Sequence, residues 1–284
     1  MKFSQTQSNF YSPRGEDFPT ALSSTTHLGI GAHADDLEIL AFPGISACYG
    51  HAKNRFSGVV VTDGAGAPRT GAFAAMSNAE MIPQRQKEQR QAAVLGQYAS
   101  VIQLAHPSSA VRQADRSQVV ADLVKILEST RPHVLYLHNP ADRHETHLAV
   151  LLACLEALHK VSAAAHPKEI YGCEVWGDLD WVPASHIVRL PCHAPAALGS
   201  SLLNCFQSQI EGGKRYDRAA LGRRHAQATF GNPTQPDSDE EVVLALDLRP
   251  LLKPKSSPTE FLAPTLDLFR KETLARLEAL SAKP

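Results

Sequence analysis

The segment HLGIGAHADDLE, residues 27–38, leads from a run of small and apolar residues into a pair of adjacent aspartates. Its first half, His27–His33, predicts a buried strand because the run is bounded by polar residues and is short. A helix is expected to follow this strand as far as about Gly50. A strand that passes directly into a helix is the unit from which parallel sheets are built.

The alternation of strand and helix continues towards the middle of the chain. Residues 56–62, FSGVVVT, predict the clearest strand because they contain a β-branched run. A helix is expected from about Pro83 to Leu95, with Pro83 in its first turn and Gly96 just past its end. Further strands are expected at 101–104 and 133–138, and further helices at 117–129 and 144–160. This order predicts an α/β protein with a Rossmann-like, mostly parallel sheet and helices on both of its faces.

Three regions are expected along the chain. Residues 1–26 are rich in Ser, Thr and Pro, which predicts an extended N-terminal arm. Residues 27–284 predict a single α/β domain. Within it, residues 27–160 are expected to form the core with the functional site, and residues 161–284 an extension that shapes the substrate pocket.

The extension is less regular than the core. Added strands are expected at 187–190 and 242–246, and a helix at 196–210. A last amphipathic helix is expected at 266–280, where the apolar residues Leu266, Phe269, Leu277 and Leu280 share one stripe. We expect this stripe to pack against the rest of the protein, with a contact in a homo-oligomer as the alternative.

Composition excludes several classes of function. The formal net charge is -1, so no electrostatic argument favours nucleic acid or an anionic membrane as the partner. Five cysteines without a CxxC motif predict free thiols in a reducing compartment. The N-terminus lacks an apolar signal core, and no apolar run reaches the roughly 18 residues of a spanning helix. The sequence therefore predicts a soluble, cytoplasmic protein.

Two carboxylates and a histidine crowd the carboxyl end of the first predicted strand. In open α/β sheets, ligands bind at this edge. Burying Asp35 beside Asp36 without a cation is costly, and a histidine nitrogen with a carboxylate oxygen suits Zn²⁺. Successive side chains at a strand end point in different directions. One carboxylate could therefore share a metal with His33 while the other faces a water molecule and acts as a general base.

Two other interpretations of this first motif stay open. Either aspartate could cap the helix that follows, since Asp is a favoured N-cap residue. Gly29 and Gly31 also form a G-x-G after a strand, with Ala34 at the position of the third glycine of a dinucleotide-binding fingerprint. Against dinucleotide binding, the acidic pair would repel a pyrophosphate.

A second cluster, His144-Glu145-Thr146-His147, follows the strand predicted at 133–138. Histidines three residues apart on a helix point to the same side. If the two strands are neighbours where the strand order reverses, both loops open into one crevice. Three protein ligands and a water molecule would then make a catalytic zinc site, whereas two ordinary histidines in a solvated first turn are the alternative.

Together the two motifs resemble those of the LmbE-like, or PIG-L, deacetylases. The resemblance covers roughly residues 27–160 and includes Thr62-Asp63-Gly64 and Arg85-x-x-Glu88. The family contains N-acetylglucosaminyl-phosphatidylinositol de-N-acetylase and deacetylases of thiol-sugar biosynthesis. It implies a Rossmann-like fold and one zinc ion per site that serves to remove acetyl groups from N-acetylglucosamine units.

Carried over by position, the resemblance implies a role for each residue of the two motifs. It implies that zinc is bound by His33, Asp36 and His147. Asp35 would be the general base, and His144 the protonated partner that stabilises the oxyanion and then protonates the departing amine.

The resemblance also implies substrate contacts and contains two departures. Arg85, Asp63 and Asp142 are expected beside the substrate, with a surface ion pair to Glu88 as the alternative for Arg85. Ala34 stands where the family usually has Pro, which removes no chemical group. Thr146 stands where many members have Asp to orient the acid histidine, a role that Asp142 could take over.

The expected reaction is zinc-dependent hydrolysis of an N-acetylated amino sugar of the GlcNAc type, releasing acetate and a free amine. A small-molecule sugar or sugar conjugate is the expected partner. Hydrolysis of another amide on the same metal site, or a non-catalytic nucleotide- or sugar-binding module, are the alternatives. Trp176 and Trp181 could stack on a sugar, with buried packing as the expected use of both. Four cations could meet a phosphate, with a solvated surface as the expected alternative: Lys214, Arg215, Arg223 and Arg224.

Overall fold

The computed structural model describes residues 2–281, and within them eight strands form one sheet in the order β1-β4-β3-β2-β5-β6-β8-β7. Met1 and residues 282–284, which the predicted arm and extension include, lie outside the described residues. The central five strands are parallel: β4 (Ser100–His106), β3 (Phe56–Thr62), β2 (His27–Gly31), β5 (Val134–His138) and β6 (Glu169–Cys173). The edge strands β1 (Asn9–Tyr11), β8 (Val242–Asp247) and β7 (Val188–Pro191) pair antiparallel with their neighbours. The predicted Rossmann-like, mostly parallel fold is confirmed.

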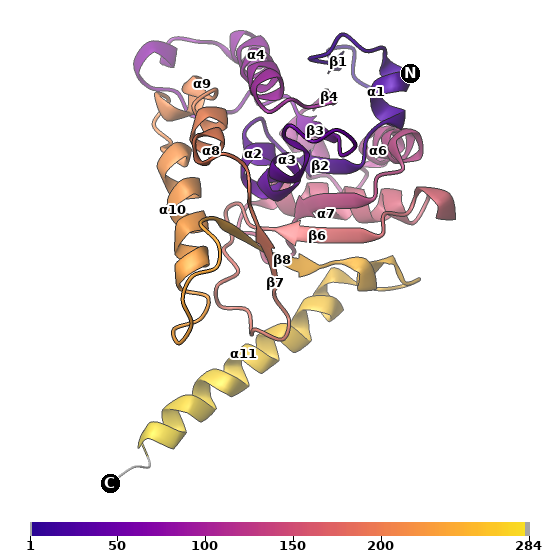
Figure 1. The fold of residues 1–284 in the computed structure, drawn as a ribbon. Coiled ribbons are helices and arrows are strands. Elements are labelled where there is room, and N and C mark those ends of the chain that lie inside the picture. Colours follow the sequence, from indigo (N-terminus) through magenta and orange to yellow (C-terminus); the bar gives the residue numbers. More distant parts are fainter. Residues whose placement is uncertain (1, 282–284) are drawn as a thin grey trace.

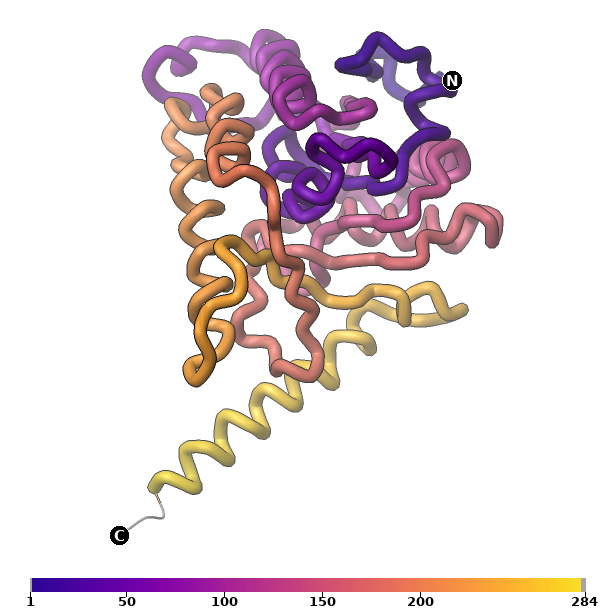
Figure 2. Tube along the Cα trace, in the orientation of Figure 1, coloured from indigo at the N-terminus to yellow at the C-terminus, as the bar shows by residue number. Residues whose placement is uncertain are grey.

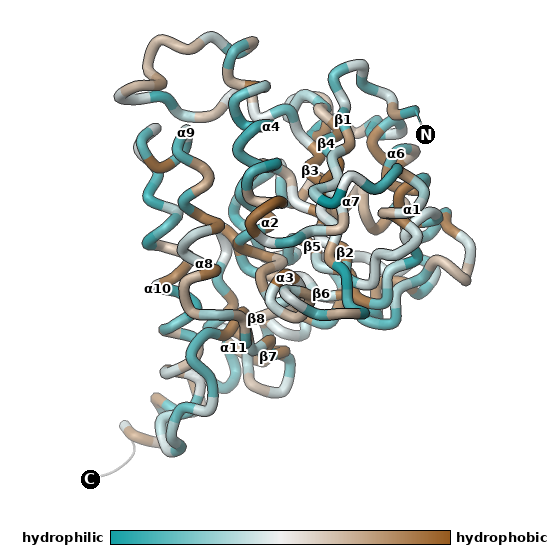
Figure 3. Tube along the Cα trace, turned by 45° about the horizontal axis from the view of Figure 1, so that its top comes forward, coloured by the Kyte–Doolittle hydropathy of each residue, from teal (hydrophilic) through white to brown (hydrophobic). Residues whose placement is uncertain are grey.

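Helices cover both faces of the sheet, and alternate residues of each strand enter two separate cores. On β3, Val59 and Val61 pack into one core and Val60 into the other. Figure 3 shows the hydrophobic residues concentrated along the central strands. Because both faces of the sheet are covered, every residue of β3 is buried. The first core contains α6 (Ser117–Thr130) and α7 (Glu145–Leu158); the second contains α2 (Asp36–Leu40), α3 (Phe42–Cys48), α4 (Asn78–Leu95) and α8 (Ala196–Leu203).

The order of the strands brings the two sequence motifs together. β2 pairs with β3 on one side and with β5 on the other, so the strand order reverses between β2 and β5. The loops that leave two such strands separate and open a crevice at the carboxyl edge of the sheet. The loop after β2 carries His33 and Asp35 and leads into α2 at Asp36, and the loop after β5 carries His144 at the start of α7.

Several predicted boundaries are wrong. α4 begins at Asn78 instead of Pro83, because Ser77 and Glu80 form a capping box that starts the helix and Pro83 lies inside it. The single helix predicted up to about Gly50 is two helices, α2 and α3, separated at Ala41. The helix predicted at 196–210 is likewise divided into α8 and α9 (Gln207–Ile210).

Several elements lie where no regular structure was predicted. In the N-terminal arm, β1 pairs with β4, and α1 (Phe18–Ser23) packs near α6. In the extension, β6 continues the parallel sheet and α10 (Tyr216–Thr229) packs against β8. The weak apolar periodicity of α10 explains why the sequence did not predict it, since a polar helix gives little hydrophobic signal.

The C-terminal helix α11 (Pro258–Ser281) extends away from the body of the protein (Figures 1 and 2). Phe269 contacts Trp181, with the ring centroids 5.7 Å apart. Further along, Leu277 is 59% exposed and Leu280 is 67% exposed. The prediction that the whole apolar stripe packs on the body is therefore wrong for its far end.

The cysteines and the helices agree with two expectations from composition. All five cysteines are free thiols, as the absence of a CxxC motif predicted. Among the helices of residues 2–281, none combines the length and apolar character needed to span a bilayer.

The two glycines of the G-x-G serve close packing of β2 against α2. A Cβ atom added at Gly31 would lie 2.8 Å from the Cβ of Asp36, which is the rigid root of a side chain. We therefore expect Gly31→Ala to lower the free energy of unfolding in urea by about 1–3 kcal/mol. Gly222→Ala is the matched control: nothing lies within 4 Å of its added Cβ, and alanine in helix α10 should be neutral or stabilising by up to about 1 kcal/mol. Equal unfolding curves for the two variants would contradict this account of the motif.

Candidate metal centre

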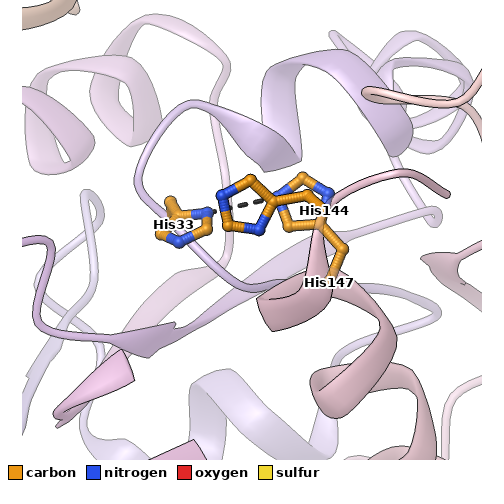
Figure 4. A group of neighbouring side chains, drawn as sticks. All are labelled: His33, His144 and His147. Carbon is orange, nitrogen blue, oxygen red and sulfur yellow. Dashed lines mark hydrogen bonds between the residues drawn. The ribbon is translucent and has the colours of Figure 1, made fainter. Parts of the chain in front are cut away.

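Three donor atoms from the two motifs meet at the carboxyl edge of the sheet. His33 Nδ1 lies 3.2 Å from His147 Nε2. Asp36 Oδ2 lies 3.3 Å from His33 Nδ1 and 3.4 Å from His147 Nε2. Figure 4 shows the rings of His33, His144 and His147 pointing toward one another, with a dashed line between His33 and His147. The atoms therefore form a nearly equilateral triangle.

The size of this triangle fits one face of a tetrahedral metal site. Bonds of about 2.0–2.1 Å place the ligand atoms of a tetrahedral ion about 3.3–3.4 Å apart. Two imidazole nitrogens and a carboxylate oxygen are ligands that zinc accepts. The same residues belong to the two groups of side chains that could hold a metal ion: His33 with His144 and His147, and Asp36 with His138 and His147. The residues present thus fit a divalent cation with an open fourth position.

His138, at the end of β5, is fully buried beside the triangle. Its Nε2 accepts a hydrogen bond from the backbone N–H of Ala32 at 2.9 Å, so the lone pair that could bind a metal is already used. Its ring stacks on that of His147, with the centroids 4.0 Å apart. His138 therefore supports the ring of His147. The sequence analysis did not name it, and its position at a strand end is the signal that could have found it.

Asp142 lies behind His147. Its Oδ2 is 3.2 Å from His147 Nδ1, although the ring N–H is not aligned well enough to count as a hydrogen bond. The backbone N–H groups of His144 and Trp176 donate to its two oxygens. A carboxylate behind a ligating histidine fixes the orientation of the ring. The prediction that Asp142 contacts substrate does not fit this arrangement, because both of its oxygens face these protein groups.

Asp35 is held in an unusual backbone conformation beside the metal ligands. Its φ angle is 91°, in the left-handed region that residues other than glycine rarely adopt. The side chain is buried, with Oδ2 3.5 Å from Arg85 Nη2 and without a hydrogen bond. Burial raises the pKa of Asp35 to about 8, and the Arg85 guanidinium offsets part of this effect. Neighbouring Asp36 behaves oppositely: burial opposes its charge, but His147 and His33 bring its pKa below the ordinary value.

His144 caps the N-terminus of α7 through its ring. Its Nδ1 accepts the backbone N–H of Thr146 at 3.2 Å, which leaves the ring proton on Nε2. Burial, together with His147 and His33, lowers the pKa of His144 to about 4. In this arrangement the ring is a neutral Nε2–H donor, whereas the resemblance implied a protonated partner. Asp36 and Asp142 favour the charged form of the ring, but less than burial and the two histidines oppose it.

A cavity of about 680 Å³ borders the donor triangle. Both aspartates of the first motif and His33 line its base, together with Asp63, Arg85 and His144. The predicted substrate contacts Asp63 and Arg85 thus face this cavity. The predicted alternative for Arg85, a surface ion pair with Glu88, is wrong. Arg85 is only 4% exposed and Glu88 instead binds Ser208.

The extension supplies the opposite wall of the cavity. Trp176 is 40% exposed and lines it, so the expectation of buried packing is wrong for this residue. Its ring centroid lies 6.0 Å from that of His144 and 6.2 Å from that of Tyr216, and Lys214 Nζ lies 5.2 Å above it. An aromatic surface therefore stands beside the histidine of the second motif.

The four cations of the extension have separate environments. Arg223 lines the cavity and donates to the carbonyl of Val175. Arg215 pairs with Asp217. Arg224 is buried against Glu241, contrary to the expected solvated surface.

Several residues of the site, among them the following three, were not predicted from the sequence. Arg112 lines the cavity and donates to the hydroxyl of Thr146 at 3.1 Å. Tyr216 lies on α10, which was not predicted. Gln89 lies on α4, and its one sequence signal was the four-residue spacing from Arg85, which places both on one helix face.

Residues 28–158 match the PIG-L family, described as GlcNAc-PI de-N-acetylase. No curated protein matches the chain significantly.

The fold is similar to that of several solved structures. GalB, the 4-carboxy-2-hydroxymuconate hydratase from Pseudomonas putida KT2440, matches with a TM-score of 0.62 and 17% identity over 82% of this chain and 98% of that chain. N,N'-diacetylchitobiose deacetylase from Pyrococcus horikoshii matches with a TM-score of 0.57 and 16% identity over 86% and 92%. The A40926 pseudoaglycone deacetylase Dbv21 matches with a TM-score of 0.57 and 12% identity over 79% and 97%. At these identities the likeness shows the shared fold.

Proposed function

We propose that this chain, whose residues 28–158 match the PIG-L family, uses zinc to hydrolyse an N-acetylated amino sugar. The observation that carries the proposal is the triangle of donor atoms from His33, Asp36 and His147, with sides of 3.2–3.4 Å. Asp35 stands beside this triangle with a buried oxygen that accepts no hydrogen bond. Such a group next to a cation site is suited to act on a water molecule.

A zinc ion held by these three residues would act as a Lewis acid on the amide carbonyl and on the attacking water. Asp35 accepts a proton from that water as the oxygen attacks the carbonyl carbon. Its Oδ2 suits this role, because it is buried beside the donor triangle and accepts no hydrogen bond from the protein. The Nε2–H of His144 donates a hydrogen bond to the carbonyl oxygen as negative charge develops there.

We propose that Asp35 also supplies the proton for the departing amine. A neutral His144 that gave up its Nε2 proton would become an imidazolate, which is too basic a product to form. Asp35 holds the proton taken from water and returns it to the nitrogen as the C–N bond breaks. Acetic acid, which ionises to acetate in solution, and a free amine leave, and Asp35 is again a carboxylate. One residue thus serves as base and then as acid, while His144 stabilises the oxyanion.

The wall opposite the metal site favours a sugar as the substrate. Trp176 and Tyr216 line the cavity with partly apolar rings, and rings of this kind stack on the apolar face of a pyranose. The pocket is also large enough for a small ligand, since about 680 Å³ lies within the usual range for such sites. We therefore propose a small GlcNAc-type sugar or sugar conjugate as substrate and a cytoplasmic location for the reaction.

We expect the purified, zinc-loaded protein to release acetate from at least one N-acetyl amino sugar. The measurement is an acetate-release screen over N-acetylglucosamine, its glycosides and its phosphates, with N-acetyl amino acids as the comparison set. Release from sugars only supports the proposed substrate class. Release from the N-acetyl amino acids only would show that the protein hydrolyses another class of amide and not amino sugars. An absence of release from every N-acetyl compound would contradict the proposed reaction.

A further inference from the structure

One peptide group of the first motif is held from both of its ends by a single helix. The Ala34–Asp35 peptide carries the carbonyl of Ala34 and the N–H of Asp35. Arg85 Nη2 donates to that carbonyl, and Gln89 Oε1 accepts from that N–H at 3.3 Å. Arg85 and Gln89 are four residues apart on α4, so they lie about one turn apart on the same face. We call this pair of contacts the peptide clamp.

The clamp acts on the most strained backbone position of the site. The φ angle of Asp35 is 91°, and a non-glycine residue in such a conformation costs on the order of 1 kcal/mol or more unless its surroundings hold it there. The peptide on the N-terminal side of Asp35 sets this angle together with the direction of its side chain. Both polar atoms of that peptide are bound by α4, so the helix holds the angle.

A second layer fixes which way Gln89 points. Its Nε2 donates to Glu38 Oε1 at 2.8 Å, and the hydroxyl of Tyr98 donates to the same oxygen at 2.7 Å. All three side chains are fully buried. A carboxylate only accepts hydrogen bonds, so Glu38 turns the amide nitrogen of Gln89 toward itself and the amide oxygen toward Asp35.

We propose that Gln89, oriented by Glu38, is a positioning residue that holds the Asp35 carboxylate in its working direction by clamping the peptide before it. Arg85 completes the clamp, and its guanidinium also lies beside Asp35 Oδ2. Gln89 is absent from the cavity lining, so we expect it to act through Asp35. The motif therefore depends on α4 for its geometry, although the two segments are about 50 residues apart in the chain.

The proposal rests on the proposed function for its effect on catalysis, but its structural part can be tested without activity. Gln89→Met removes the acceptor while keeping an unbranched side chain. We expect amide hydrogen exchange in the segment containing Asp35 to accelerate about tenfold, the loss expected for one buried hydrogen bond. With an active wild type, kcat should fall about 10- to 100-fold because the carboxylate is misdirected, while KM and bound zinc stay within about twofold. Gln91→Met, on the exposed face of α4, is the matched control.

Exchange of the two partners provides a rescue that a general packing defect would not show. Gln89→Glu alone sets two carboxylates against each other where 2.8 Å now separates an amide from a carboxylate. Adding Glu38→Gln restores an amide beside a carboxylate, with the two groups exchanged between positions 38 and 89. The carboxylate at position 89 can then accept from both the Asp35 N–H and the amide at position 38, whose oxygen can accept from Tyr98. We expect Gln89→Glu to resemble Gln89→Met, and the double variant to recover slow exchange and kcat to within about threefold of wild type.

The outcomes separate the two proposals. Unchanged exchange and kcat in Gln89→Met, or a double variant no better than Gln89→Glu, would overturn the peptide clamp. If Gln89→Met does not fold, the comparison of Gln89→Glu with the double variant still decides the matter. A wild type without deacetylase activity would refute the proposed function and leave the exchange measurements as a complete test of the clamp.

Discussion

Asp35→Asn is expected to lower kcat on the best N-acetyl substrate by about 10³-fold while the protein keeps its zinc. Asparagine has nearly the shape of aspartate but cannot accept a proton from water or return one to the amine. The residue is buried and its Oδ2 has no hydrogen bond. Arg85 is therefore the charged partner that the substitution leaves without its carboxylate. The measurements are steady-state kinetics and the zinc content of the same preparation by elemental analysis.

Asp267→Asn, on the exposed part of α11, makes the same chemical change far from the site and should leave kcat unaltered. An Asp35→Asn protein with full zinc and wild-type kcat would exclude Asp35 as the base. A protein that lost both zinc and activity would instead make Asp35 a ligand. Zinc content therefore has to be measured alongside the rate.

The sequence predicted the meeting of the two motifs on one condition, that the two strands before them are neighbours in the sheet. His33–Asp36 and His144–His147 each follow an apolar strand, and parallel strands expose their carboxyl ends at one edge. The pairing of β2 with β5 then brings the motifs into contact. The repeating pattern of strand and helix thus predicted the fold. The contact of the two motifs depended in addition on the pairing of β2 with β5.

The sequence could not predict contacts that depend on side-chain direction. Asp142 is two residues before His144 and was expected near substrate or near that ring. The turn instead directs one of its oxygens toward His147 Nδ1. His144 was expected as an acid, but the N-terminus of α7 offers it an N–H, and accepting that hydrogen bond fixes a neutral ring. Local backbone geometry determines the partners of both side chains, and this geometry cannot be inferred from residue type and spacing.

Long-range partners were missed for a different reason. Gln89, on α4, was not predicted at all. Trp176, in the loop after β6, was named, but its place beside His144 was not. Both lie at distances along the chain from the two motifs that no local pattern encodes. The capping box at Ser77 and Glu80 was visible in the sequence and would have placed the start of α4 correctly. Even so, the turn of Gln89 toward Asp35 requires the buried carboxylate of Glu38.

Loss of the metal is expected to remove activity completely and to lower the thermal stability of the protein. Two histidines and Asp36 converge within 3.4 Å of one another, and a cation bound only by the folded state stabilises it by about 2.7 kcal/mol at a concentration 100 times its Kd. Treatment with a chelator should therefore lower Tm, and added Zn²⁺ should restore both Tm and acetate release. The measurements are differential scanning calorimetry across a zinc titration and the deacetylase assay.

Asp36→Asn is the variant that ties this stabilisation to the proposed ligands. The neutral amide oxygen is a weaker ligand than the carboxylate, and Asp36 Oδ2 also accepts the backbone N–H of His33 at 2.7 Å, so the change disturbs two ligands at once. We expect zinc affinity to fall by more than the roughly 10- to 100-fold that loss of an outer partner costs, and the zinc-dependent rise in Tm to shrink accordingly. Asp35→Asn makes the identical change one residue earlier and should keep the full rise. If both variants kept the zinc-dependent rise in Tm, the metal would have to lie elsewhere. If both lost it, the two aspartates would share the metal, and the proposal that Asp36 is a ligand and Asp35 a base would be wrong.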